Sequence, residues 1–173
     1  MKKILIAICL VASASFFASC KRAEPDLAGG TAIQKMAGFW DVRVDVVDKD
    51  NNYYEDPFGL GVLPLMTYNT SDNSSTEMWI DDMESFWSYK FKVDVSYPDR
   101  VFHTKDGWRP YDAANTGNAV VYTGKILEGK GHNVHGQPCD SIAFVIKFSD
   151  ETDDTIDHYQ VCGIRHGGYE TVE

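Results

Sequence analysis

Hydrolysis is the first chemistry to look for in this sequence, because it requires only a nucleophile, a base and a group that orients the base. The serines cluster at residues 71–75, in a predicted solvent-exposed turn, and no Gly-x-Ser-x-Gly elbow is present. His158 adjoins Asp157 on the last predicted hairpin, where neighbouring strand residues point to opposite faces. The sequence thus identifies no catalytic residues and favours a protein that is not an enzyme.

Metal binding is the second chemistry to consider. His132 and His135 form a His-x-x-His pair among glycines, and Asp140 follows shortly after. A metal ion needs at least a third ligand that converges on the same point, and the spacing supplies none. We therefore expect two exposed loop histidines, no metal and no cofactor.

Cys20 offers a different chemistry, covalent lipid attachment. Two lysines precede an apolar run at residues 4–18, which is too short to span a bilayer comfortably and is typical of a signal peptide. The run ends in Phe17-Ala18-Ser19-Cys20, which resembles the bacterial lipobox. The resemblance implies cleavage before Cys20 and acylation of its thiol and new amino group. We expect a signal peptide at residues 1–19 and membrane attachment through acylated Cys20.

The remainder of the chain divides into a tether and one domain. Residues 20–32 are polar, are interrupted by Pro25 and by two adjacent glycines, and predict a flexible tether. Residues 33–173 have the length of one domain. The net charge is −10, and it becomes −12 without residues 1–19, which contain two lysines and no acidic residue. This charge argues against nucleic acid and against electrostatic docking on anionic lipid.

Two further cysteines lie in this domain, Cys139 and Cys162. An even pair in an exported chain is compatible with a disulfide, and the predicted last hairpin would bring the two roughly opposite each other. The alternative is a pair of buried free thiols.

The elements that must position these residues are strands. Trp40, Val42, Val44 and Val46 alternate with polar residues, and apolar and polar residues alternate again over residues 87–97. A period of two predicts half-buried antiparallel strands. About eight strands are expected, at residues 38–46, 65–70, 76–80, 87–97, 101–104, 119–127, 142–148 and 156–165.

Eight consecutive strands with one apolar face each favour an all-β fold, a single antiparallel barrel, because closure removes exposed edges. A β-sandwich is the alternative. Residues 31–37 are the one segment expected to be helical, besides parts of 106–117. Residues 53–63 are rich in large apolar side chains and predict either a lid at a pocket mouth or a loop packed over one barrel end.

Six aromatic residues are expected to face the barrel interior. They either fill the core or line a pocket for one small apolar ligand, with the tyrosine hydroxyls orienting it. The six are Trp40, Trp87, Tyr89, Phe91, Tyr122 and Phe144.

Two ends of the domain resemble the lipocalin, or calycin, pattern. Gly38-Phe39-Trp40 is similar to the Gly-x-Trp that opens the first lipocalin strand, and Arg165 is similar to the arginine that packs across that tryptophan. A guanidinium over an indole face is a favourable cation–π contact, which would help to close the barrel.

A closer resemblance covers most of the mature chain. With the lipobox, residues 37–42, 135–142 and 163–170 resemble a Bacteroidetes lipoprotein family described as lipid-binding putative hydrolases. The resemblance implies a lipocalin-like barrel, but its hydrolase label transfers no motif to named residues here.

These observations leave three functions open. The first is an outer-membrane-anchored lipoprotein, facing periplasm or exterior, whose barrel binds a small apolar or amphipathic ligand. The second is a structural or envelope-interaction lipoprotein with a filled core, and the third is a lipid or ester hydrolase.

Overall fold

The structure, a computed structural model, describes residues 29–114 and 116–167. The chain divides into two compact units, residues 1–30 and residues 31–173. The predicted signal peptide, the predicted acylation site at Cys20 and most of the predicted tether lie outside the described residues. In the described part of the chain, no helix has the length and hydropathy needed to cross a membrane.

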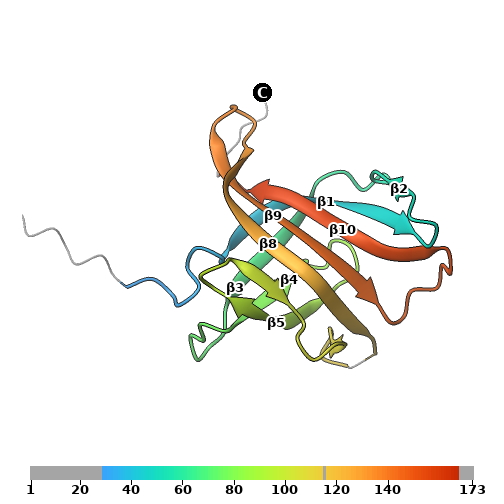
Figure 1. The fold of residues 1–173 in the computed structure, drawn as a ribbon, viewed down its shortest axis with the longest axis horizontal. Coiled ribbons are helices and arrows are strands. Elements are labelled where there is room, and N and C mark those ends of the chain that lie inside the picture. The colour runs from blue at the N-terminus through green and yellow to red at the C-terminus, as the bar shows by residue number, and fades with distance from the viewer. Residues whose placement is uncertain (1–28, 115, 168–173) are drawn as a thin grey trace, which may run out of the picture. The chain divides into compact units, whose positions relative to one another are not determined.

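The domain is a closed antiparallel β-barrel (Figure 1). Eight strands follow the order β1-β3-β4-β5-β6-β8-β9-β10, and the pairing of β10 with β1 closes the ring. β2 pairs with β1 and β7 with β8, outside the ring. The predicted barrel is thus confirmed and the sandwich excluded. The strands are β1 (Gly38–Asp48), β2 (Tyr53–Tyr54), β3 (Leu63–Asn69), β4 (Glu77–Asp81), β5 (Lys90–Ser96), β6 (Val101–His103), β7 (Arg109–Pro110), β8 (Asn118–His132), β9 (Pro138–Phe148) and β10 (Ile156–Arg165).

Alternating burial along the strands matches the sequence pattern. In β1, Trp40, Val42, Val44 and Val46 are all buried, whereas Arg43 is exposed. The inner face of β5 is likewise apolar and its outer face polar. Burying each such side chain contributes roughly 1.5–3 kcal/mol. This gain turns the apolar face of each strand toward the barrel interior.

The barrel interior is filled by side chains. Apolar residues that face the axis, such as Trp40, Phe91 and Phe144, have at most 3 % of their surface accessible to water. An open lumen large enough for a ligand would leave part of that surface accessible, so these side chains pack against one another. Of the two expectations for the inner aromatic residues, the structure shows the filled core.

Tyr122 is a correction to the predicted interior. Its side chain is 54 % exposed on the outside of β8, with the Lys147 ammonium 5.5 Å from its ring centroid. The β8–β9 register shifts between Val121 and Thr123, which marks a bulge. One extra residue reverses the alternation, so Val121 and Gly124 face inward and Tyr122 faces out.

The predicted disulfide is also corrected. Cys162 in β10 lies opposite Ala143 in β9, whereas Cys139 lies four residues away along β9. Four residues of strand span about 13 Å, well beyond the Cα separation of about 4.4–6.8 Å that a disulfide tolerates. No bond joins Cys139 to Cys162.

Residues 31–37 form a hydrogen-bonded turn, not the expected helix. The amides of Met36 and Ala37 both donate to the Ile33 carbonyl, at 2.7 and 3.0 Å. Ile33 and Met36 have no accessible surface, so the turn fits into one end of the barrel. We call this the closed end, and the other, where loops 49–62, 82–89, 104–117 and 149–155 lie, the loop end.

Candidate functional site

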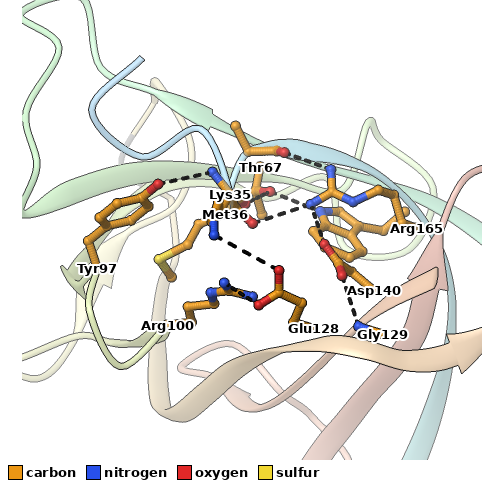
Figure 2. Close-up of polar contacts among 11 residues, drawn as sticks. Lys35, Met36, Thr67, Tyr97, Arg100, Glu128, Gly129, Asp140 and Arg165 are labelled. Atoms are coloured by element: carbon orange, nitrogen blue, oxygen red, sulfur yellow. Dashed lines mark hydrogen bonds and ion pairs between the residues drawn. The ribbon is translucent and has the colours of Figure 1, made fainter. Parts of the chain in front are cut away.

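The closed end is organised around Arg165, as Figure 2 shows. The guanidinium lies 4.5 Å from the Trp40 ring centroid, which is a cation–π contact. It also donates to the Ala37 carbonyl at 2.8 Å, to the Lys35 carbonyl at 3.3 Å and to Asp140 at 3.2 Å. The lipocalin resemblance implied that Arg165 packs across Trp40, and the structure has the two side chains in contact.

Gly38 and Thr67 complete this end. A Cβ atom on Gly38 would collide with the Arg165 guanidinium, which explains a glycine two residues before Trp40. The buried Trp40 indole donates to Thr67 Oγ1 at 2.9 Å, and Thr67 in turn donates to the Met36 carbonyl at 2.6 Å. Among the residues that the structure describes, no buried side-chain nitrogen or oxygen lacks a hydrogen-bond partner, and these contacts seal the closed end of the barrel.

The loop end is filled by an aromatic cluster. Trp87 and Phe148 are stacked, with ring centroids 4.5 Å apart and planes 6° from parallel. Tyr159 lies 5.8 Å from Phe148 and 5.1 Å from Phe86. Such ring pairs contribute about 0.5–1.5 kcal/mol beyond simple burial. The aromatic cluster comprises Phe86, Trp87, Tyr89, Tyr111, Phe148 and Tyr159.

The polar atoms of the aromatic cluster converge on two carboxylates of the β9–β10 turn. Tyr111 Oη donates to Asp150 at 2.6 Å, and the Trp87 indole approaches the same carboxylate at 3.4 Å. Tyr159 Oη donates to Glu151. Burial, and then the Asp150 carboxylate, raise the pKa of Tyr111 to about 12, and burial with Glu151 raises the pKa of Tyr159 further.

Trp87 reaches the aromatic cluster from a loop, although the sequence predicted a strand there. The buried Asp82 carboxylate accepts the backbone N–H groups of Phe86, Trp87 and Ser88, at 3.2, 2.8 and 2.9 Å. These bonds curl residues 82–89 and delay the start of β5 to Lys90. Burial raises the pKa of Asp82, and the hydrogen bonds oppose that rise.

Above the aromatic cluster lies the apolar loop, which we define as residues 53–62. Phe58, Leu60 and Val62 are 50, 38 and 65 % exposed, and the Phe58 ring lies 6.4 Å from that of Tyr159. Asp56 holds the loop in shape, because its carboxylate accepts the amide of Leu60 at 2.8 Å. A hydrogen-bonded loop therefore presents apolar side chains to solvent at one barrel end.

The apolar loop is also fixed to the barrel wall. The buried Asp45 carboxylate in β1 accepts Tyr53 Oη at 2.6 Å and the Asp56 amide at 3.0 Å. The Asp45 hydrogen bond raises the pKa of Tyr53 to about 12. Of the two expectations for this segment, the structure shows the loop packed over a barrel end, with Phe58, Leu60 and Val62 exposed on it, and the lid at a pocket mouth stays a prediction.

A groove of about 640 Å³ lies outside the barrel, beside β5. Trp79, Lys90, Lys92 and Arg109 contribute to its walls. The three cations already have carboxylate partners. Lys90 pairs with Asp81 at 3.2 Å, Lys92 pairs with Glu77 at 3.3 Å, and Arg109 pairs with Asp94 at 2.7 Å. Paired charges of this kind provide no net field for an ionic ligand, so the loop end is the stronger candidate site.

Catalysis finds little support in the side-chain geometry. Neighbouring residues of a strand were expected to point to opposite faces, but Asp157 and His158 contact each other, with Oδ2 and Nδ1 2.8 Å apart. Across residues 29–114 and 116–167, however, no serine, threonine or cysteine is hydrogen-bonded to a histidine ring. The same residues contain no group of three or more His, Cys, Asp or Glu side chains suited to a metal ion.

The structure separates the six aromatic residues assigned to the interior. Trp40 lies at the closed end, and Trp87 and Tyr89 belong to the aromatic cluster at the loop end. Phe91 and Phe144 are buried core residues. Phe148 and Tyr159 were missed as site residues, although both continue the inward alternation of their strands.

An eight-stranded barrel sealed at one end by an arginine–tryptophan pair, with an apolar loop at the other, defines a lipocalin-like protein. Residues 26–170 match the family described as "Lipid-binding putative hydrolase", and the chain belongs to this family.

Two further comparisons add less. No curated protein matches the chain. A crystal structure of a Bacteroides ovatus protein of unknown function matches with a TM-score of 0.44 and 13 % identity. The match covers 75 % of this chain and 41 % of that one, so the chain spans less than half of that protein's length.

Proposed function

We propose that this protein is a cell-envelope lipoprotein, anchored at the outer membrane by acylated Cys20, whose barrel binds a lipid-like amphipathic ligand at the loop end. One observation carries the proposal: exposed apolar side chains are gathered on the apolar loop, whose Phe58 ring lies 6.4 Å from the Tyr159 ring of the aromatic cluster. The family description, which names lipid binding, supports the same class of ligand.

The filled interior determines where the ligand would lie. A chain inside the barrel would have to displace buried residues such as Phe91 and Phe144, at several kcal/mol each. A chain lying along Phe58, Leu60 and Val62 displaces only water. We therefore expect the ligand to bind at the surface, between the apolar loop and the aromatic cluster, and not in the barrel interior.

Binding can be tested with the Cys20→Ser protein, which lacks the thiol that would be acylated and can therefore be purified without detergent. The probe is a brominated monoacylglycerol, whose bromine atoms quench a tryptophan that they contact. We expect saturable quenching, weakened about a hundredfold or more by Phe58→Ser, Leu60→Ser and Val62→Ser combined, because each loses roughly 1–2 kcal/mol of apolar burial.

Val134 is the matched control, since it is 70 % exposed but lies in the β8–β9 turn at the closed end. Val134→Ser should leave binding unchanged. Absence of quenching with monoacylglycerols of several chain lengths, or equal binding by the triple variant, would refute the proposal.

Anchoring is tested separately. In cells given radiolabelled palmitate, the wild-type protein should acquire label and sediment with membranes, whereas Cys20→Ser should do neither. A labelled Cys20→Ser protein would place the acyl chain elsewhere.

The filled interior also favours a second candidate, an envelope-interaction lipoprotein that binds no small ligand. The two candidates differ in the quenching experiment, because the second predicts no saturable binding of any amphiphile.

A further inference from the structure

Residues 82–89, which connect β4 to β5 and which we call the flap, have an unusual backbone conformation. Met83, Glu84 and Ser88 have φ angles of 52°, 59° and 59°. Residues of these types rarely adopt this left-handed conformation, because it brings Cβ too close to the following carbonyl oxygen. The flap therefore stores backbone strain at three positions, which other contacts must offset.

The Asp82 carboxylate supplies the hydrogen bonds that keep the flap in this shape. It accepts the amide of Glu84 at 3.1 Å, in addition to the amides of Phe86, Trp87 and Ser88. All four donors belong to the flap itself, so these bonds shape the flap without attaching it to other segments. Because one buried carboxylate serves all four donors, its displacement would release them together.

The base of the flap is a sharp boundary. The β4–β5 ladder ends at the pair formed by Asp81 and Lys90, and the Asp82 amide then donates to the Tyr89 carbonyl at 3.1 Å. The residues between these two points belong to no strand. The flap can therefore change shape without breaking any strand pairing of the barrel.

Hydrogen bonds from the flap to other segments are long. Ser85 Oγ donates to the Pro64 carbonyl at 3.2 Å, and Trp87 Nε1 approaches Asp150 at 3.4 Å. Both distances exceed the usual range for their donor types. Polar contacts therefore contribute little to holding the flap against the barrel.

Packing of two rings holds the flap against the aromatic cluster. Phe86 lies 5.1 Å from Tyr159, and Trp87 is stacked on Phe148. The two flap rings are only partly buried, whereas Phe148 and Tyr159 are 4 and 2 % exposed. Withdrawal of the flap would thus uncover the two strand residues.

We infer that the flap opens cooperatively while the barrel stays folded, and that the closed flap is the form that binds the amphiphile. On opening, Asp82 releases the four amides, the strained residues relax, and Phe86 and Trp87 leave the aromatic cluster. Strain favours this opening, and the weak attachments to other segments oppose it little.

The second half of the inference rests on the proposed function. Phe86 of the flap and Phe58 of the apolar loop both lie against Tyr159, with ring centroids 5.1 and 6.4 Å from it. A chain between the apolar loop and the aromatic cluster therefore contacts the flap rings only when the flap is closed. A ligand with this difference in contacts must shift the flap toward the closed state.

Opening is tested first without ligand, by amide hydrogen exchange of the Cys20→Ser protein followed by NMR. The amides of Phe86, Trp87 and Ser88 should share one opening equilibrium, populated about a hundredfold or more above the opening that exposes the amides pairing β4 with β5. If the three amides exchange no faster than those ladder amides, the flap opens only when the barrel unfolds and the inference fails. Three unequal opening equilibria would also refute cooperative opening.

Strain is tested by comparing Glu84→Gly with Glu84→Ala. Both variants lack the Glu84 carboxylate, but only glycine removes the clash of Cβ, so Glu84→Gly should open about threefold less often than Glu84→Ala. At an unstrained position the sign is reversed, because glycine gives the open state more conformational freedom. More frequent opening of Glu84→Gly than of Glu84→Ala would therefore refute the strain.

Coupling to the ligand is tested by repeating the exchange with the brominated monoacylglycerol. At about ten times its dissociation constant, it should reduce opening about tenfold if it binds only the closed flap. Glycerol, which has the head group without the chain, should have no effect. If the monoacylglycerol binds but leaves the exchange unchanged, the closed flap is not part of the site, while lipid binding stands. If no amphiphile binds, the proposed function fails, and the ligand-free exchange still decides whether the flap opens.

Discussion

The Arg165 guanidinium lies 4.5 Å from the centre of the Trp40 ring and joins the last strand of the barrel to the first. The same side chain binds two carbonyls of the turn that seals the closed end, those of Lys35 and Ala37. One residue therefore links β1, β10 and the N-terminal turn.

Arg165→Ala should lower the free energy of unfolding by about 2–4 kcal/mol, because it removes the cation–π contact and leaves Asp140 and two carbonyls without this donor. Urea unfolding followed by tryptophan fluorescence measures the change. Arg43→Ala is the control, since its ion pair with Glu55 is exposed and should contribute less than about 1 kcal/mol. Equal unfolding midpoints for the two variants would contradict this role for Arg165.

Asp82→Ala should disorder the loop that holds Trp87. The buried Asp82 carboxylate is the acceptor for several consecutive backbone amides, and its loss should lower the free energy of unfolding by about 2–4 kcal/mol. The fluorescence of Trp87 should shift to longer wavelength, and the brominated monoacylglycerol should bind more weakly. An unshifted spectrum would show that the loop keeps its shape without Asp82.

Alkaline pH should destabilise the loop end before the rest of the barrel. The pKa values of Tyr53 and Tyr111 are raised from 10 to about 12, and that of Tyr159 is raised further. The neutral phenol is thus favoured in the folded state, and the stability it contributes is complete below pH 10 and is lost as the pH rises through 12. Tyrosinate absorbance and circular dichroism during a base titration measure this loss.

Tyr159→Phe removes the Glu151 bond and one of these titrating groups, so it should reduce the alkaline loss of stability. Tyr122→Phe is the control, because Tyr122 lies outside the barrel. If all exposed and buried tyrosines ionise together near pH 10 without unfolding, the prediction is wrong.

The register of β9 and β10 predicts a disulfide that the natural sequence does not form. Ala143→Cys would lie opposite Cys162, at the Cα separation of about 4.5–5.5 Å that adjacent antiparallel strands impose. Mild oxidation should therefore link the two and change the electrophoretic mobility of the unreduced protein. The wild-type protein should show no such change from Cys139 and Cys162. A Cys139–Cys162 bond in the oxidised wild type would contradict the register.

The strands were predictable from sequence because alternation reports directly on burial. Trp40 and Arg165 were also predictable, since a local motif and the last strand locate them. Tyr122 was misplaced because a bulge inserts one residue and reverses the alternation without leaving a sequence signal. Trp87 was placed on a strand because its side chain continues the apolar pattern, although Asp82 curls the backbone there.

The candidate site was less accessible to sequence reasoning. The apolar content of residues 53–62 was visible, but not which of their side chains face solvent. Whether the barrel is open or filled depends on packing volumes, which no periodicity encodes. The convergence of Tyr111, Tyr159 and Trp87 on Asp150 and Glu151 joins segments that are distant in sequence.

The pairing of β10 with β1 has a kinetic consequence. Trp40 lies opposite Arg165, so the contacts that close the ring join residues 125 positions apart. Folds dominated by such distant contacts form slowly, on the order of milliseconds to seconds. Until β10 docks, the two edges that it will cover, one on β1 and one on β9, both have unpaired backbone N–H and C=O groups. Aggregation during folding should therefore start at these two edges, and a chain that ends before residue 156 should be prone to it.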